Sequence, residues 1–301
     1  MKLVEQSFEI LNQDLSELPS DVVVGPKIIR EFLFENMLKQ IERVGRVCYK
    51  SEDKIAPGTA QKFVNMLKEH AHGAMLEHGT IYLDRFISKR DCLDMGISEE
   101  WWEFYRKYVD NPYSKVVKLD TESGVHCYVT TNYRVIVEND WESDLEFMCE
   151  STIHHKKRIT VKFVTDQGIL REYTRHRTFS FAVESTRYCN YSKDKFGNEI
   201  TFIVPCWCLL DKNGKTAREF YHYLQLAEDG YFKMLEEGWK PQQARNVLPM
   251  ATKCEMVMTG FVDDWKHFFM LRCDPAAHPQ AQELAVYLKR SFIEQGYVSA
   301  E

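Results

Sequence analysis

The chain has 301 residues, of which 44% are hydrophobic and 28% charged, and this composition excludes the disordered, collagen-like and coiled-coil classes. Its 45 acidic residues outnumber its 39 Lys and Arg residues, giving a net charge of -6, whereas a protein that coats nucleic acid is usually basic. The first residues lack the apolar core of a signal peptide, and no apolar run approaches the ~20 residues of a membrane helix. We therefore expect a soluble, cytoplasmic protein.

The first half of the chain predicts a mixture of helices and strands. After Pro26, apolar residues recur every three or four positions, which is typical of an amphipathic helix. Ser98 is placed to cap a later helix, which Asn111-Pro112 ends. The expected elements are, in chain order, a helix over 26–49, a helix over 59–72, a strand over 81–87, a helix over 99–110, a strand over 125–137 and a short helix over 144–151. The basic run 154–158 is expected to be a solvated turn.

The second half of the chain also predicts a mixture of helices and strands. Ile159, Val161 and Phe163 alternate with less apolar residues, which favours a strand. Asp263 is expected to cap one helix, and Pro279 stands at the first turn of the last one. The expected elements are a strand over 159–164, a short helix over 169–175, a strand over 199–204, a helix over 216–237, a short helix ending at 248–249, a strand over 253–261 and helices over 263–271 and 279–292. Because strands and helices do not strictly alternate, we predict an α+β fold with an antiparallel sheet flanked by helices.

The nine cysteines are odd in number and scattered, and no CxxC pair occurs among them. The close pair Cys206 and Cys208 is weak support for zinc, because a structural site needs two further ligands at suitable spacing. Reduced cysteines in a reducing compartment are the simpler interpretation. We expect no metal.

One segment, residues 171–188, concentrates positive charge in an acidic protein. It holds Arg171, Arg175, Arg177, Arg187 and a histidine. Arginine offers a planar fork of donors that matches phosphate and carboxylate. The pattern is compatible with a site for an anionic small molecule and equally with an exposed helix end whose arginines form salt bridges.

The spacing within this segment resembles a known signature. Arg175-His176-Arg177, seven residues and Ser185 form the RHRx7S motif of the flavin-dependent thymidylate synthases, and Arg187-Tyr188 follows as it does in that family. Three other segments resemble further family blocks and occur in the family's order: Glu77-His78, Ala244 to Pro249, and Leu271 to Asp274. The resemblance covers most of residues 26–90 and 158–295. We therefore expect a single domain over residues 1–301 with an insertion at about 91–157.

The resemblance implies a methyltransferase that converts dUMP to dTMP. Methylenetetrahydrofolate would donate the carbon, FAD would carry the hydride, and NADPH would reduce the flavin. The family's enzymes are homotetramers whose active sites are shared between subunits, so the implied partners are these small molecules and further copies of the chain, with no nucleic acid and no membrane. The anionic groups of the substrate, FAD and folate are groups that arginine binds well.

The resemblance also assigns individual residues. The residues that would contact dUMP are Arg175, Ser185, Arg187, Arg245 and Arg272. The residues that would contact FAD are His78, His176, Arg177 and His267. Arg272 is the expected catalytic residue, because it would bond the uracil carbonyl and stabilise charge that develops on the ring. Ser185 would bind substrate and not act as a nucleophile, since no GxSxG surrounds it.

Several positions depart from the family pattern. Ala182-Val183 stands where the family has an Asn-Glu pair, and the nearest glutamate, Glu184, lies one position later than the family's Glu. Ala251 replaces an Asn. Glu172 stands where the family has Gln, and its carboxylate would repel a phosphate unless it is protonated or turned away. These changes motivate an alternative, a catalytically impaired homologue that binds FAD and nucleotide.

Two further alternatives come from single features. Pro205-Cys206 invites comparison with the cysteine-dependent thymidylate synthases, in which a thiolate attacks the uracil ring. Trp207 stands where that family has His, and the RHRx7S motif is foreign to it. A nucleic-acid binding module is suggested by the basic runs but opposed by the acidic balance and by the lack of interleaved aromatic residues.

Overall fold

The computed structural model describes residues 1–11, 13, 25–187, 189–193, 197–210 and 214–299. The chain forms two compact units. Unit 1 comprises Met1–Leu11, Arg46–Glu52 and Val161–Glu301, and unit 2 comprises Asn12–Gly45 and Asp53–Thr160. Among the helices of the described ranges, none is both long and apolar enough to cross a membrane.

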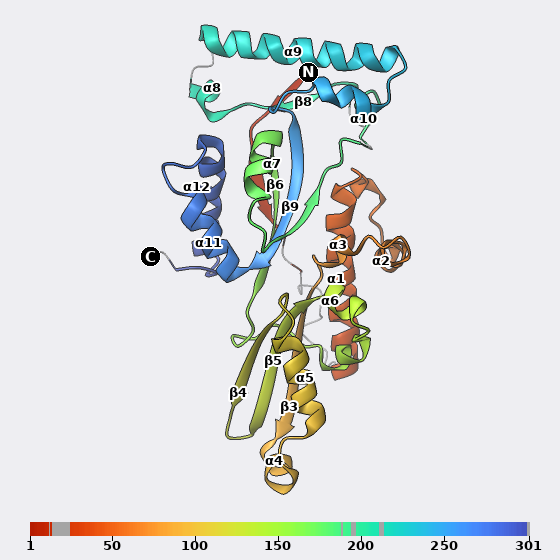
Figure 1. The fold of residues 1–301 in the computed structure, drawn as a ribbon, viewed down its shortest axis with the longest axis vertical. Coiled ribbons are helices and arrows are strands. Elements are labelled where there is room, and N and C mark those ends of the chain that lie inside the picture. Colours follow the sequence, from red (N-terminus) through yellow and green to blue (C-terminus); the bar gives the residue numbers. More distant parts are fainter. Residues whose placement is uncertain (12, 14–24, 188, 194–196, 211–213, 300–301) are drawn as a thin grey trace. The chain divides into compact units, whose positions relative to one another are not determined.

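Unit 1 is built on a four-stranded sheet in the order β2-β6-β9-β7 (Figure 1). Its strands are β2 (Ser7–Ile10), β6 (Arg158–Asp166, whose residues from Val161 on belong to this unit), β7 (Ser180–Val183) and β9 (Lys253–Phe261). β2 pairs antiparallel with β6, and β7 pairs antiparallel with β9. Residues 254–260 of β9 are all buried, because neighbouring strands flank β9 and both of its faces are covered.

Three helices pack against this sheet: α7 (Gln167–Tyr173), α11 (Val262–Arg272) and α12 (Pro279–Glu294). Aromatic rings form the contact, with Tyr173 lying 5.2 Å from Phe163 and 4.9 Å from Phe268 between ring centroids. Asp166 caps α7 and also accepts a 3.1 Å hydrogen bond from Gln280 of α12. One buried carboxylate therefore fixes two helices at the end of β6, and so fixes the chain that leads into the RHRx7S motif.

The rest of unit 1 surrounds a second, smaller sheet. β1 (Lys2–Val4) pairs parallel with β8 (Thr201–Ile203). The helices that follow are α8 (Cys206–Leu210), α9 (Lys215–Glu236), α10 (Pro241–Ala244) and the 3-10 helix η4 (Arg245–Val247). The long helix α9 lies over this sheet and packs Leu224 and Tyr231 against Ile200 and Phe202 (Figure 1).

Unit 2 contains a three-stranded antiparallel sheet in the order β3-β5-β4. Its elements are α1 (Pro26–Val47, whose last two residues belong to unit 1), the 3-10 helix η1 (Glu52–Lys54, which begins in unit 1), α2 (Thr59–Glu69), α3 (Gly73–Leu76), β3 (Thr80–Ser88), α4 (Lys89–Met95), α5 (Glu99–Val109), β4 (Lys115–Asp120), β5 (Gly124–Asn132), α6 (Tyr133–Glu138) and the 3-10 helix η2 (Glu142–Phe147). Ser98 caps α5 as predicted, and Trp101 and Phe104 of α5 share one core with Leu83 and Val129 of the sheet.

The α+β class, the antiparallel sheets, the strand over 253–261 and the helix that begins at Pro279 are confirmed. The strand prediction is wrong for residues 133–137, because the Asn132 side chain accepts a hydrogen bond from the Val135 N–H and starts α6. Asp263 does not cap α11. The helix begins one residue earlier, and Asp264 accepts the 3.0 Å hydrogen bond from the Phe261 N–H.

Two predictions between residues 144 and 158 also need correction. The helix expected over 144–151 is the 3-10 helix η2, and Met148 is extended because it bridges to Leu83 of β3. The basic run is only partly solvated, because His155 is buried. One ring nitrogen of His155 accepts a 3.0 Å hydrogen bond from the Thr152 N–H, and the other lies 3.1 Å from the Leu83 carbonyl.

Candidate active site

The RHRx7S motif surrounds strand β7. Arg175, His176 and Arg177 lie in the turn after α7, where the Phe179 N–H donates to the His176 carbonyl at 3.2 Å. Ser185 follows the last residue of β7 by two positions. The three peptide steps of a four-residue strand cover roughly 10 Å. The fixed spacing of the motif is therefore the length of a turn plus a short strand, and it places two groups of polar residues at the two ends of β7.

At the first end, Arg272, Glu172 and His176 contact one another, and we call these three residues the Arg272 cluster. The Nη1 of Arg272 lies 2.7 Å from the Glu172 carboxylate, and its Nη2 donates to the Glu172 main-chain carbonyl. Its Nε donates to Nε2 of His176 at 2.9 Å. Arg272 is the last residue of α11, so helix packing brings it onto the end of α7.

His176 is the buried member of the motif. Its ring lies 5.0 Å from the ring of Phe268 and 6.4 Å from that of His267, between centroids. Burial, together with the charge of Arg272 and the proximity of His267, lowers the pKa of His176 to about 4. The ring is therefore neutral at pH 7, and because Nε2 accepts from Arg272, its proton is on Nδ1.

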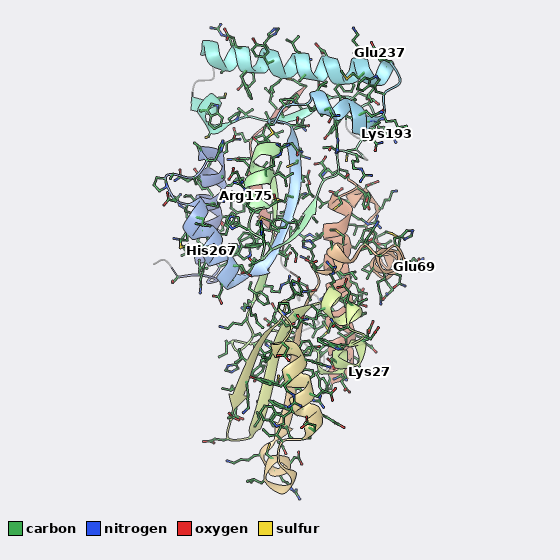
Figure 2. All side chains as sticks on the ribbon, in the orientation of Figure 1. Lys27, Glu69, Arg175, Lys193, Glu237 and His267 are labelled. Carbon is green, nitrogen blue, oxygen red and sulfur yellow. The ribbon has the colours of Figure 1, made fainter. Side chains whose placement is uncertain are left out.

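Other predicted residues near this end are exposed. Arg175 and Arg177 flank the buried His176 with their side chains in solvent, and His267 is exposed on α11. Figure 2 labels Arg175 after α7 and His267 on α11. Guanidinium and imidazole groups are donors suited to phosphate oxygens, so this set of residues fits a phosphate-bearing group such as the FAD pyrophosphate.

At the second end of β7, the chain turns away from the sheet. The Ser185 N–H donates to the Cys48 carbonyl at 2.9 Å, and Ser185 is half-buried. Arg245 of η4 donates from Nη1 to the Thr186 hydroxyl at 2.7 Å. The structure thus brings Arg245 beside the residues that follow β7. Arg187 is exposed, and Tyr188 lies outside the described residues.

Next to Ser185 lies a group of charged side chains that the sequence analysis did not predict. Both Glu184 and Glu255 are buried, and the five residues that we call the lysine cluster are Glu184, Glu255, Lys50, Lys162 and Lys253. Glu255 receives the ammonium groups of Lys50 at 2.5 Å, Lys162 at 2.6 Å and Lys253 at 2.7 Å. Glu184 receives Lys253 at 2.9 Å and the Glu255 N–H at 3.1 Å. Alternation along β9 places residues 253 and 255 on one face, but their partners come from distant segments.

His78 is the predicted site residue that belongs to unit 2, where it is fully buried between α3 and β3. The preceding Glu77 forms a 2.6 Å ion pair with Arg134, and its carbonyl accepts a 2.9 Å hydrogen bond from Arg158. These contacts fix the Glu77-His78 segment within unit 2.

Two other candidate chemistries find little support. Burial and the charge of Glu283 raise the pKa of the Cys206 thiol, which disfavours the thiolate that a cysteine-dependent synthase needs. Within the described ranges, no group of three or more His, Cys, Asp and Glu side chains is arranged to hold a metal ion.

Comparison with known proteins connects this geometry to a family. The model of the Thy1 family, described as thymidylate synthase complementing protein, matches residues 145–295. A flavin-dependent thymidylate synthase of Synechocystis sp. is 27% identical over 142 residues, which are 45% of this chain and 66% of that protein. Another, of Corynebacterium glutamicum, is 31% identical over 130 residues, which are 38% of this chain and 49% of that protein.

Among solved structures, the UMP/dUMP methylase PolB of Streptomyces cacaoi bound with 5-Br dUMP is similar, with a TM-score of 0.42 and 16% identity over 98% of this chain and 93% of that one. The matched region spans about half to two thirds of the length of the two curated relatives. Because the family model covers half of the sequence, including both ends of β7, the chain belongs to the Thy1 family.

Proposed function

We propose that the chain methylates dUMP to dTMP, with methylenetetrahydrofolate as the carbon donor, FAD as the hydride carrier and NADPH as the reductant. The observation that carries the proposal is the Arg272 cluster, in which the buried histidine of the signature motif and the Glu172 carboxylate hold the Arg272 guanidinium. Membership of the Thy1 family and the names of the curated relatives support the same reaction.

In this proposal, Arg272 is the catalytic residue. A guanidinium has five N–H groups, and three of those of Arg272 are used by Glu172 and His176. One of the remaining two would donate to a carbonyl of the uracil ring. A positive group at that position stabilises negative charge that develops on the carbonyl oxygen when the ring reacts.

The other residues would bind the two ends of the nucleotide and the cofactor. Ser185, Arg187 and Arg245 would hold the phosphate side of dUMP, and Arg175 would also contact dUMP. By the family resemblance, the residues that would hold FAD are His78, His176, Arg177 and His267. When bound, FAD would supply the hydride-transfer chemistry that no side chain of the protein can perform.

The first test is a visible absorption spectrum of the purified protein, with the released chromophore identified after denaturation. We expect FAD, which NADPH bleaches faster when dUMP is present, and formation of dTMP when methylenetetrahydrofolate is added. A protein that binds FAD and dUMP but forms no dTMP would instead be the impaired homologue. A protein that binds no added FAD would refute both.

We also propose a homotetramer with active sites shared between subunits. Light scattering of the eluted protein should give about four times the mass of one chain. Mixing Arg272→Ala protein with His78→Ala protein after mild dissociation should restore activity if the two residues serve one site from different subunits. Activity that stays at the level of the separate variants would count against shared sites.

A further inference from the structure

Glu172 stands at a position where the family has Gln, and from the sequence its carboxylate is expected to repel a phosphate. The structure gives its carboxylate a different role. Glu172 Oε2 lies 2.7 Å from Nη1 of Arg272, while the Glu172 main-chain carbonyl accepts from Nη2. The carboxylate is therefore turned toward a cation.

These contacts fix the plane of the guanidinium. Arg272 is held along one edge by His176 and along another by Glu172, so the directions of its two remaining N–H groups are set. The Arg272 side chain is 13% exposed and that of Glu172 is 36% exposed. An ion pair with one partly exposed partner contributes little to stability, so its main consequence is geometric.

The contacts also set the local charge. His176 is neutral, so Glu172 is the group that compensates the charge of Arg272 within the cluster. A compensated guanidinium still donates hydrogen bonds, but it attracts an anion much less than an uncompensated one does. Such a pair suits a neutral carbonyl better than a phosphate.

We propose that Glu172 is a positioning and specificity-determining residue: by holding and neutralising Arg272, it directs a remaining N–H group toward the pyrimidine carbonyl and excludes phosphate from that point. This inference rests on the proposed function for the identity of the substrate. It concerns a carboxylate of this chain and not the reaction of the family as a whole.

Glu172→Gln is the variant that tests it, because the amide keeps an acceptor for Arg272 and removes the charge. We expect kcat to fall by about 10- to 100-fold, since a small displacement of an orienting group has effects of this size. The KM for dUMP should change less than about threefold, because the phosphate contacts lie at the other end of β7. Glu172→Asp keeps the charge and should recover most of the lost kcat.

A second measurement does not require turnover. Inorganic phosphate is the probe, and its dissociation constant is measured by calorimetry on the wild type and on Glu172→Gln, both carrying Arg187→Ala and Arg245→Ala so that the phosphate site proposed beside Ser185 is removed. We expect the variant to bind phosphate at least about tenfold more tightly, because Arg272 is then uncompensated. Asp263→Asn is the control, since it removes an exposed, ion-paired carboxylate from α11, where Asp263 pairs with Lys266 at 3.1 Å. The control should match the wild type in both assays.

The outcomes separate this proposal from the proposed function. Wild-type protein that makes no dTMP contradicts the proposed function, and the phosphate measurement still decides whether Glu172 neutralises Arg272. An active wild type together with a Glu172→Gln variant of unchanged kcat overturns the positioning role. Equal phosphate affinity in wild type and variant overturns the exclusion of phosphate. Circular dichroism of each variant verifies that it is folded.

Discussion

Replacement of Glu255 by Gln should destabilise unit 1 by about 3–5 kcal/mol. The Glu255 carboxylate accepts three ammonium groups at 2.5–2.7 Å, and its side chain is 9% exposed. Removing one partner of a buried ion pair costs about 3–5 kcal/mol because the other charge is left uncompensated. Glu184 would still neutralise Lys253 at 2.9 Å, and Glu52 would still pair with Lys50 at 3.3 Å, so the charge of Lys162 accounts for most of the loss.

The free energy of unfolding from urea titrations at pH 7 measures the effect. Asp263→Asn is again the control, because the exposed Asp263–Lys266 pair should contribute less than about 1 kcal/mol. If Glu255→Gln unfolds within about 1 kcal/mol of the wild type, the three lysines are solvated in the folded protein, and the buried cluster does not anchor the segment before Ser185.

The pH dependence of the same variant adds an independent check. Burial by itself raises the pKa of Glu255, but the charge of Lys253 and the hydrogen bonds from Lys162, Lys253 and Lys50 outweigh it and hold the pKa well below the usual 4.5. A carboxyl whose folded pKa lies below its unfolded value stabilises the fold above the unfolded pKa, and this contribution is lost as the pH falls. The difference in unfolding free energy between wild type and Glu255→Gln should therefore shrink below about pH 4.5.

Three other predictions concern stability. Burial and the charge of Arg272 lower the pKa of His176 from 6.5 to about 4, so as the pH falls the unfolded chain binds this proton before the folded chain does. The free energy of unfolding of the wild type should therefore fall by up to about 3 kcal/mol between pH 6.5 and 4. An equal pH dependence in His176→Gln would contradict this. Gly260→Ala would place a Cβ 2.6 Å from the Phe179 ring and should cost about 1–3 kcal/mol in urea unfolding, whereas unchanged stability would mean that the ring can move aside. Tyr108→Phe removes a 2.7 Å hydrogen bond to the buried Asp144 carboxylate and should cost about 1.5–3 kcal/mol in unit 2, and a neutral effect would show that Lys107 alone satisfies that carboxylate.

Sequence patterns predicted those elements whose burial follows a simple period. β9 lies where alternation put it, and α12 begins at the proline expected at its first turn. The errors occur where one hydrogen bond decides between two structures that the local composition allows. Residues 133–137 have strand-forming side chains, yet the Asn132 cap turns them into a helix. His155 looked solvated within a basic run, but its ring bonds to β3, a contact between residues 72 positions apart.

In the candidate site, too, local patterns were predictable from the sequence and long-range contacts were not. The RHRx7S motif gave the residues at both ends of β7, because the spacing is local. The partner of Arg272 could not be found that way, since Glu172 and Arg272 are 100 residues apart and only the packing of α11 beside α7 brings them together. The lysine cluster is likewise invisible in sequence, because its carboxylates and ammonium groups come from four separate segments.

The charge balance along β7 supports the proposed orientation of the nucleotide. At the first end, the charges of Arg272 and Glu172 cancel, and of the exposed arginines of the motif, Arg177 is proposed for the cofactor and Arg175 for dUMP. At the second end, the three lysines are balanced by Glu184, Glu255 and Glu52, which lies 3.3 Å from Lys50, so the excess positive charge beside Ser185 comes from Arg245. A phosphate dianion is stabilised beside such an excess of positive charge, whereas a neutral pyrimidine ring needs donors without net charge. In the proposed orientation the base lies at Arg272 and the phosphate at Ser185, and reversing the charge balance at either end should disturb binding at that end first.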